Sequence, residues 1–258
     1  MSFVKRKVAP DTWVLEGEGA YAYLLTGKDT AMLVDSGMSR HDIHAFCKTI
    51  TDLPITGVIN THGHFDHTGG NGYFDKVYMH PLAAETAKTP FGYLPPDAYP
   101  LDYEPEFVKE GQVFNLGERE LEIIFIGAHS PGSLAILDRS NRLLFTGDEL
   151  EAGQVLLIPS GYDPRTQTVE NHLRQMLKLR ERMDEFDYIC PSHNGTMIDK
   201  SYVDYFIETD ELILSGKGVG GDLPPDMAWL RRPDVKRFEH NDAAICYIPS
   251  DNERDGPK

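Results

Sequence analysis

The 258-residue sequence has few cysteines, no long apolar run and a deficit of basic residues. Its three cysteines, Cys47, Cys190 and Cys246, are an odd number without CxxC spacing, which excludes a disulfide framework and is typical of a reducing compartment. No run of about 18 apolar residues occurs, so no transmembrane helix is predicted. The basic residues near the N-terminus are followed by no apolar stretch, which predicts no signal peptide. We therefore expect a cytoplasmic protein.

The charge balance is strongly acidic and narrows the range of partners. Asp and Glu number 41 against 25 Lys and Arg, which gives a net charge of −16. Such a charge argues against nonspecific binding to nucleic acid or to anionic lipid. We expect a small-molecule substrate, with no nucleic-acid and no membrane partner. One basic segment, residues 231–237 (RRPDVKR), either binds an anionic tail on the substrate or is a solvated charge cluster.

Apolar periodicity predicts strands and helices interleaved along the whole chain. Amphipathic helices are expected at residues 40–50, 81–88, 166–182 and 202–214. Short strands are expected at residues 13–15, 20–25, 31–34, 57–60, 76–79, 121–126, 134–137, 143–145, 188–190 and 243–248. No composition change marks a linker, so we expect a single α/β domain over residues 1–258.

Two segments stand apart from this pattern. Residues 89–105 hold five prolines together with Phe91, Tyr93, Tyr99 and Tyr103, a composition that excludes a regular helix or a central strand. Such an aromatic loop either covers a pocket as a lid or packs on the surface through its own rings. Residues 216–258 form a C-terminal extension whose last residues, from Asn252, are polar and are expected to fray.

Candidate metal ligands are concentrated in the segment THGHFDH, residues 61–67, directly after an expected strand. It offers His62, His64, Asp66 and His67 within six residues. Imidazole nitrogens and carboxylates are good ligands for Zn²⁺ and similar ions. Four such groups in one short loop would be costly to bury without a common partner. The spacing therefore predicts a metal site.

Three further candidate ligands lie downstream, each shortly after an apolar strand. They are His129 in GAHSPGS, Asp148 in FTGDEL and His193 in CPSHNG. Each also has an ordinary interpretation as a turn residue. Together with the first loop they bring the number of ligands to seven, which suits two metals that share a bridging carboxylate.

In this pattern the chain resembles the metallo-β-lactamase superfamily of hydrolases. The resemblance runs from about Trp13 to Leu214 and includes Asp35 in VDSG. It implies a four-layer αββα sandwich with the metals at one edge, between two sheets. It further implies that Asp148 bridges a first metal, held by His62, His64 and His129, and a second metal, held by Asp66, His67 and His193. Asp35 either supports the metal loop or caps a turn at the end of its strand.

The resemblance to this superfamily implies hydrolysis. Two adjacent divalent ions lower the pKa of a bridging water and so generate hydroxide near neutral pH, with Asp66 placed to orient this nucleophile or to move its proton. Zn²⁺ suits the ligands best, and Fe or Mn also fits. We expect a glyoxalase II-like or lactonase-like enzyme that acts on a small ester, thioester or lactone.

Departures from the pattern separate the subfamilies. Asp148 excludes the β-lactamases with cysteine at that position, and His64 disfavours the flavodiiron proteins, which carry glutamate there. Persulfide dioxygenases bind one iron through the positions of His62, His129 and Asp148, so a mononuclear iron enzyme stays an alternative. A metal-binding sensor without turnover is a third. Of the other histidines, His240 is a candidate pocket residue, and His41, His44, His80 and His172 are assigned to structure or surface.

Overall fold

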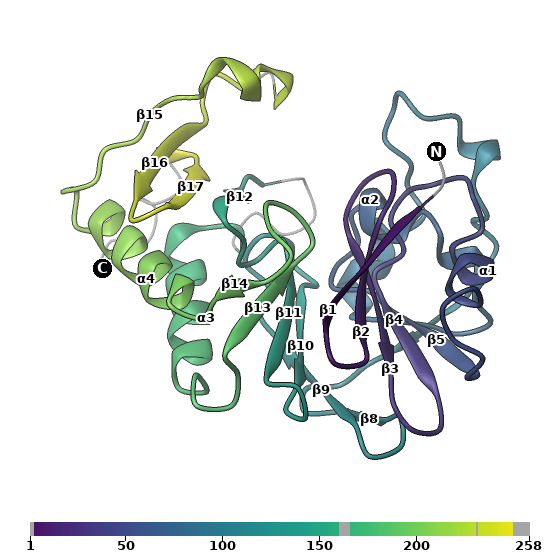
Figure 1. Ribbon diagram of the computed structural model, residues 1–258. Coiled ribbons are helices and arrows are strands. Elements are labelled where there is room, and N and C mark those ends of the chain that lie inside the picture. The colour runs from purple at the N-terminus through teal and green to yellow at the C-terminus, as the bar shows by residue number, and fades with distance from the viewer. Residues whose placement is uncertain (1–2, 160–165, 231, 250–258) are drawn as a thin grey trace.

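The computed structural model describes residues 3–159, 166–230 and 232–249, which form three β-sheets and the helices that cover them (Figure 1). The first sheet has its strands in chain order. Strands β1 to β4 are antiparallel, and β4 to β7 run parallel. The strands are β1 (Val4–Ala9), β2 (Thr12–Glu16), β3 (Ala22–Thr26), β4 (Ala31–Val34), β5 (Ile55–Ile59), β6 (Val77–Met79) and β7 (Pro105–Phe107).

The second sheet faces the first, and its strands follow the order β14-β13-β11-β10-β9-β8. All of its pairs are antiparallel except β11 with β13. The strands are β8 (Val113–Asn115), β9 (Glu120–Phe125), β10 (Leu134–Asp138), β11 (Leu143–Gly147), β13 (Tyr188–Pro191) and β14 (Ile198–Asp199).

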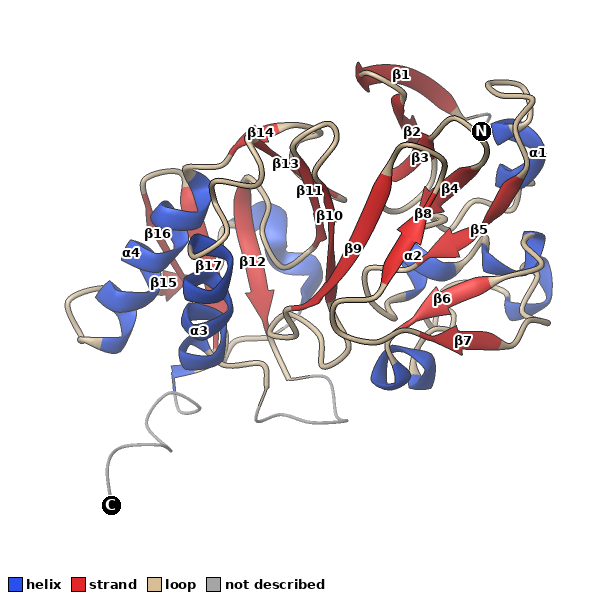
Figure 2. Ribbon diagram, turned by 90° about the horizontal axis from the view of Figure 1, so that it is seen from below, coloured by secondary structure: helices blue, strands red, loops and turns tan. Residues whose placement is uncertain are grey.

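Helices cover the outer face of each sheet (Figure 2). Helix α1 (Ile43–Cys47) packs on the first sheet through Ile43 and Cys47, which join Leu33 and Val58 in one apolar cluster. Helices α3 (Val169–Arg180) and α4 (Tyr202–Leu214) pack on the second sheet. The remaining helices are α2 (Phe65–Thr68) and the 3₁₀ helices η1 (Asn71–Tyr73), η2 (Pro81–Glu85), η3 (Pro96–Ala98) and η4 (Pro225–Leu230).

A separate core lies between the two sheets. Tyr23 and Leu25 from β3 meet Ile123 from β9 and Phe145 from β11 there, all of them fully buried. Because β3, β4, β10 and β11 are buried on both faces, their sequences are continuous apolar runs rather than alternating ones. The expected αββα sandwich is confirmed.

One polar clamp joins the two sheets within this core. The Arg119 side chain, only 4% exposed, pairs with the fully buried carboxylate of Asp138 on β10. Its other guanidinium N–H groups donate to the carbonyls of Asp11 and Thr26 and to the Thr12 hydroxyl. These three acceptors lie on or beside β2 and β3 of the opposite sheet, so a single side chain connects both layers.

Strands of the C-terminal extension join one earlier strand in a third, small sheet beside α4. Its order is β12-β17-β16-β15, with β12 (Gly153–Leu157) parallel to β17 (Ala243–Tyr247). Strands β15 (Gly221–Asp222) and β16 (Lys236–His240) complete it. The core of the second sheet continues into this sheet through Val155 and Ile245. That residues 1–258 form one domain stays a prediction, and the polar tail from Asn252 lies outside the described residues.

Several expected elements differ from the observed ones. Helix α4 confirms the expected range, whereas α1 is shorter than residues 40–50 because Asp42 caps its start. The segment expected as a helix at 81–88 is the 3₁₀ helix η2. Within residues 89–105 only η3 is regular, and Pro105 opens the edge strand β7, where its missing N–H costs least. None of the described helices is long and apolar enough to cross a membrane.

Candidate metal centre

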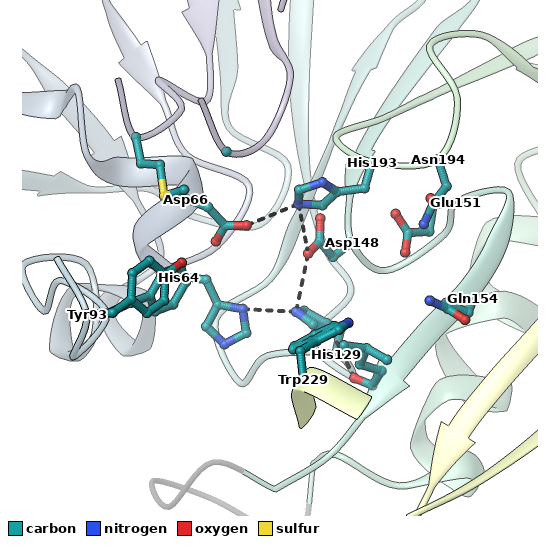
Figure 3. A pocket seen from close by; sticks show the side chains of 14 residues that line it. His64, Asp66, Tyr93, His129, Asp148, Glu151, Gln154, His193, Asn194 and Trp229 are labelled. Carbon is teal, nitrogen blue, oxygen red and sulfur yellow. Dashed lines mark hydrogen bonds and ion pairs between the residues drawn. The ribbon is translucent and has the colours of Figure 1, made fainter. Parts of the chain in front are cut away.

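The seven candidate ligands meet at one edge of the sandwich, between the two sheets. Figure 3 shows the five of them that line the pocket, His64, Asp66, His129, Asp148 and His193. All four ligands of the first loop follow β5: His62 and His64 precede the short helix α2, and Asp66 and His67 lie within it. His129 follows β9, Asp148 follows β11 and His193 follows β13. Strands β11 and β13 are parallel neighbours, so the residues after them leave the sheet at the same edge.

The first group of ligand atoms comes from three histidines and one aspartate. His62 Nε2 lies 2.9 Å from His64 Nδ1, which lies 3.1 Å from His129 Nε2. Asp148 Oδ2 is 4.0 Å from His62 Nε2 and 3.7 Å from His129 Nε2. All four atoms lie within 4.8 Å of one another. These separations are those of ligands around one ion, since metal–nitrogen bonds are about 2.0–2.1 Å long.

The second group comprises Asp66, His67 and His193. Asp66 Oδ2 lies 3.2 Å from His193 Nε2 and 3.8 Å from His67 Nε2. Asp148 faces this group as well, with Oδ1 3.2 Å from His67 Nε2 and Oδ2 3.7 Å from His193 Nε2. The structure therefore places the Asp148 carboxylate between the two groups.

Hydrogen bonds at the rear of two imidazoles fix which nitrogen faces the centre. His129 Nδ1 donates to the Leu156 carbonyl and His67 Nδ1 donates to Asp35, each at 2.8 Å. Both rings therefore present the lone pair of Nε2 to the centre. His67 Nε2 and Asp148 Oδ1 are buried and make no hydrogen bond among the described residues. Buried acceptors of this kind need a partner, and a divalent cation fits them.

Asp35 holds the first loop and the second group together. Its fully buried carboxylate accepts hydrogen bonds from the Thr61 amide, the Thr61 hydroxyl, His67 Nδ1 and the Ser192 hydroxyl, all at 2.8–2.9 Å. The expected contact between Asp35 and the loop is therefore present in the structure. Because it touches His67 and the residue before His193, Asp35 orients two of the candidate ligands.

A sharp turn delivers Asp148 to the centre. Gly147 has φ +57°, and a Cβ at this position would lie 2.4 Å from the Thr61 hydroxyl oxygen. Only glycine combines this backbone with such a close approach. Glu149, two residues after Gly147, accepts hydrogen bonds from the backbone amides of Ala128 and His129 at 2.8 and 2.7 Å. The Asp148 and His129 loops are therefore positioned by each other.

His172 is structural, as the sequence predicted. It is fully buried on α3, where Nδ1 contacts Asp210 at 2.7 Å and Nε2 contacts the Glu149 carbonyl at 3.1 Å. Burial opposes its charge, yet Asp210 raises the pKa of His172 above its ordinary value, so both ring nitrogens donate. This pair anchors the loop that carries Asp148 to the two outer helices.

The electrostatics of the centre suit metal ligation. Burial lowers the pKa of His62 well below its ordinary range and that of His64 to about 4, which keeps both imidazoles neutral. Burial opposes the charge on Asp148, but His67 and His193 hold the pKa of this carboxyl well below its usual value. Neutral imidazoles and an ionised carboxylate are the states that bind a metal. Despite burial, Asp148, Asp35 and Asp66 raise the pKa of His67, so these carboxylates favour a positive charge at this position, and a bound cation would supply it in place of the ring proton.

A cavity of about 550 Å³ opens onto this centre. Phe91 and Tyr93 line it, whereas Tyr99 is buried against Phe65 with ring centroids 4.8 Å apart. The expected lid loop thus contributes two of its rings to the pocket. The sequence analysis missed several other lining residues, namely Met38, Glu151, Gln154, Leu156, Asn194 and Trp229. Only the position of Glu151 and Asn194 next to ligand motifs in the sequence signals their role.

Two other expectations about the pocket fare differently. His240 lies away from the centre, in a hollow beside Glu208 at the end of α4, so it does not line the pocket. In the basic cluster, Arg232 pairs with Asp234, Lys236 with Asp222 and Arg237 with Glu239. Neighbouring carboxylates thus form ion pairs with the basic side chains that were candidates to bind an anionic tail of the substrate. Arg231 lies outside the described residues.

Comparison with known proteins agrees with this geometry. The family model of the metallo-beta-lactamase superfamily matches residues 15–193, more than half of the chain. The chain belongs to the metallo-beta-lactamase superfamily. Its recognised part contains all seven candidate ligands and Asp35, while strands β15 to β17 follow after it. The superfamily and the curated relatives include hydrolases, which supports an enzyme.

Two curated relatives are named as a thioesterase and as a hydrolase. An acyl-coenzyme A thioesterase (MBLAC2) of Gallus gallus is 25% identical over 177 residues, which cover 56% of this chain and 64% of the relative. A hydroxyacylglutathione hydrolase of Francisella tularensis is 32% identical over 130 residues, which cover 50% of this chain and 47% of the relative. The chain thus matches less than two thirds of each relative's length.

Solved structures support the fold alone. A metallo-beta-lactamase from Pontibacter korlensis has a TM-score of 0.64 at 18% identity, and the match covers 81% of this chain and 99% of that one. A sec-alkylsulfatase from Pseudomonas sp. has a TM-score of 0.66 at 15% identity, over 83% of this chain and 42% of that one.

Proposed function

We propose that this superfamily member is a binuclear metal-dependent hydrolase of a small ester, thioester or lactone, with Zn²⁺ as the preferred ion and Fe or Mn as substitutes. The observation that carries the proposal is the position of the Asp148 carboxylate, which lies within 4 Å of imidazole nitrogens from both groups: Oδ1 faces His67, and Oδ2 faces His129 and His193. A single ion would leave one of these groups without a buried cation. The names of the two curated relatives favour a thioester.

The proposed roles follow from where each residue lies. His62, His64 and His129 would hold one ion, Asp66, His67 and His193 the other, and Asp148 would bridge them. The bound ions would supply a hydroxide nucleophile near neutral pH and polarise the substrate carbonyl. Asp66 lines the cavity next to His193. Burial opposes its charge, yet His67 and His193 lower the pKa of Asp66, so an ionised carboxylate there would orient the nucleophile or accept its proton.

The experiment that tests this function is metal analysis of protein purified without added metal, followed by a substrate panel of thioesters, lactones and phosphodiesters. We expect about two equivalents of divalent metal per chain and turnover of a thioester or lactone. Removal of the metal by a chelator should abolish turnover, and Zn²⁺ should restore it. One tightly bound iron with oxygen consumption on a persulfide would instead identify the dioxygenase alternative. Bound metal without turnover of any panel member would support the sensor alternative.

The lid interpretation predicts a change in substrate binding when Tyr93 is shortened. Tyr93 is 75% exposed, stacks on Phe91 with ring centroids 5.9 Å apart and lines the cavity. Because most of the Tyr93 side chain is exposed, removing its remaining apolar contact costs only about 1 kcal/mol. We therefore expect Tyr93→Ala to raise KM about fivefold on the best panel substrate, with kcat and metal content unchanged. Tyr188→Ala, an exposed tyrosine at the far end of β13, is the control. An unchanged KM would return residues 89–105 to a structural role.

A further inference from the structure

The wall of the cavity away from Tyr93 carries a buried carboxyl group that the proposed reaction does not use. Glu151 lines the cavity and is only 5% exposed. One of its oxygens, Oε2, is fully buried and makes no hydrogen bond among the described residues. Figure 3 shows the group beside Asn194, on the side of Asp148 opposite Tyr93. A buried carboxyl oxygen without a partner is costly, so its place at a binding cavity calls for a ligand.

The protein itself offers Glu151 little besides Asn194. The Asn194 side chain hydrogen-bonds to Glu151, but burial and the nearby Asp148 carboxylate raise the pKa of this carboxyl well above its ordinary value. Asn194 has φ +48°, a left-handed conformation that asparagine tolerates better than most residues, and it directly follows the candidate ligand His193. None of the described residues that line the cavity is lysine or arginine. A molecule that enters the cavity is therefore in a position to supply a donor to this carboxyl.

The third sheet fixes this wall in place. Strand β12 begins at Gly153, directly after the Glu151 turn, and pairs in parallel with the C-terminal strand β17. Gln154 on β12 also lines the cavity, and its Oε1 accepts a hydrogen bond from Arg237 on β16 at 3.2 Å. The polar wall is thus held by strands that follow the recognised superfamily region. A rigid support of this kind suits a binding contact, because such a contact has to hold its geometry.

We propose that Glu151 is a specificity-determining residue that accepts a hydrogen bond from an N–H group of the substrate, either a neutral amide or an ammonium group. This inference rests on the proposed function and names the substrate class: an acyl compound with an N–H donor on one side of the scissile bond and an apolar group on the other. The apolar group lies against Phe91, Tyr93 and Trp229, which form the other part of the cavity lining. The acidic wall disfavours an anionic tail.

Equilibrium binding to the metal-loaded protein tests this assignment without turnover. The probes share one alkyl group: N-butylacetamide, its N-methyl derivative without a donor, and n-butylammonium. A hydrogen bond contributes about 0.5–1.5 kcal/mol net, so wild type should bind the amide about 2–10-fold more tightly than the N-methyl amide. Glu151→Met should reduce this ratio to about one. Glu151→Gln keeps an acceptor oxygen but cannot ionise, so it should retain most of the amide preference and lose any ammonium binding.

Two controls make the outcome decisive. Glu120→Met replaces an exposed glutamate on β9 and should leave every affinity unchanged. Circular dichroism and metal content show whether each Glu151 variant folds and loads. Tighter binding of N-butylacetamide would identify the substrate donor as a neutral amide, and tighter binding of n-butylammonium would identify it as an ammonium group. Equal affinity of wild type for the amide and its N-methyl derivative, or no saturable binding of either donor-bearing probe, would overturn the inference. The hydrolysis panel decides the proposed function separately, since these probes need no turnover.

Discussion

Asp148→Asn is expected to bind at least one metal ion more weakly and to lower kcat by more than about 100-fold, beyond the range for residues that only support a ligand. In the structure one carboxylate oxygen faces His67 and the other faces His129 and His193. An amide keeps the shape of this group but loses its charge, and its nitrogen is a poor ligand. The mutual repulsion of two bound cations would then be offset less well. The measurement is metal content after dialysis, together with kcat on the best panel substrate.

Asp35→Asn is the matched comparison, because it makes the same chemical change at a residue that contacts a candidate ligand and is not itself one. Asp35 contacts His67 but faces no other candidate ligand atom directly. We expect a loss of about 10–100-fold in metal affinity or activity, the usual effect of changing a partner of a ligand. Both variants should give the circular dichroism spectrum of wild type. If Asp148→Asn keeps two metals and near-normal turnover, Asp148 is not the bridge and the proposed centre is wrong.

Arg119→Met is expected to lower the free energy of unfolding by about 3–5 kcal/mol while leaving the chemistry of the metal centre intact. The guanidinium pairs with the fully buried Asp138 and donates to acceptors at Asp11, Thr12 and Thr26 on the facing sheet. Methionine fills a similar volume, but it leaves a buried carboxylate and several acceptors without donors. Urea denaturation followed by tryptophan fluorescence measures the change.

Arg139→Met is the control for this stability prediction. Arg139 also pairs with carboxylates, those of Glu122 and Glu185, but its side chain is 49% exposed. Exposed ion pairs contribute about 0–1 kcal/mol, so the control should change stability little. The double variant Arg119→Met, Asp138→Leu should recover part of the loss, because the unpaired charge is gone. A loss below about 1 kcal/mol for Arg119→Met alone would contradict the clamp between the sheets.

The sequence predicted the elements whose patterning is strong and local. Residues 31–34 and 202–214 were predicted with their observed bounds, because apolar runs and helical spacing mark them clearly. It indicated only Val8 of β1 and missed β8, β12 and β16, where exposed or mixed residues alternate weakly. These strands form only because a neighbouring strand supplies their hydrogen bonds. Pairing between β12 and β17, about 90 residues apart, depends on the tertiary fold and not on any local signal.

The sequence by itself determined which residues are able to form a metal centre, because histidine and aspartate at this density have few other uses. The grouping of seven residues into two sets around Asp148 required the facing sheets, since His129, Asp148 and His193 reach the first loop only through the parallel and antiparallel register of β9 to β13. Only the tertiary structure decided that Asp35 and Glu149 orient these ligands, and that Glu151 ends buried and unpaired at the cavity. Burial and hydrogen-bond partners are set by residues distant in the chain, and no spacing in the sequence encodes them.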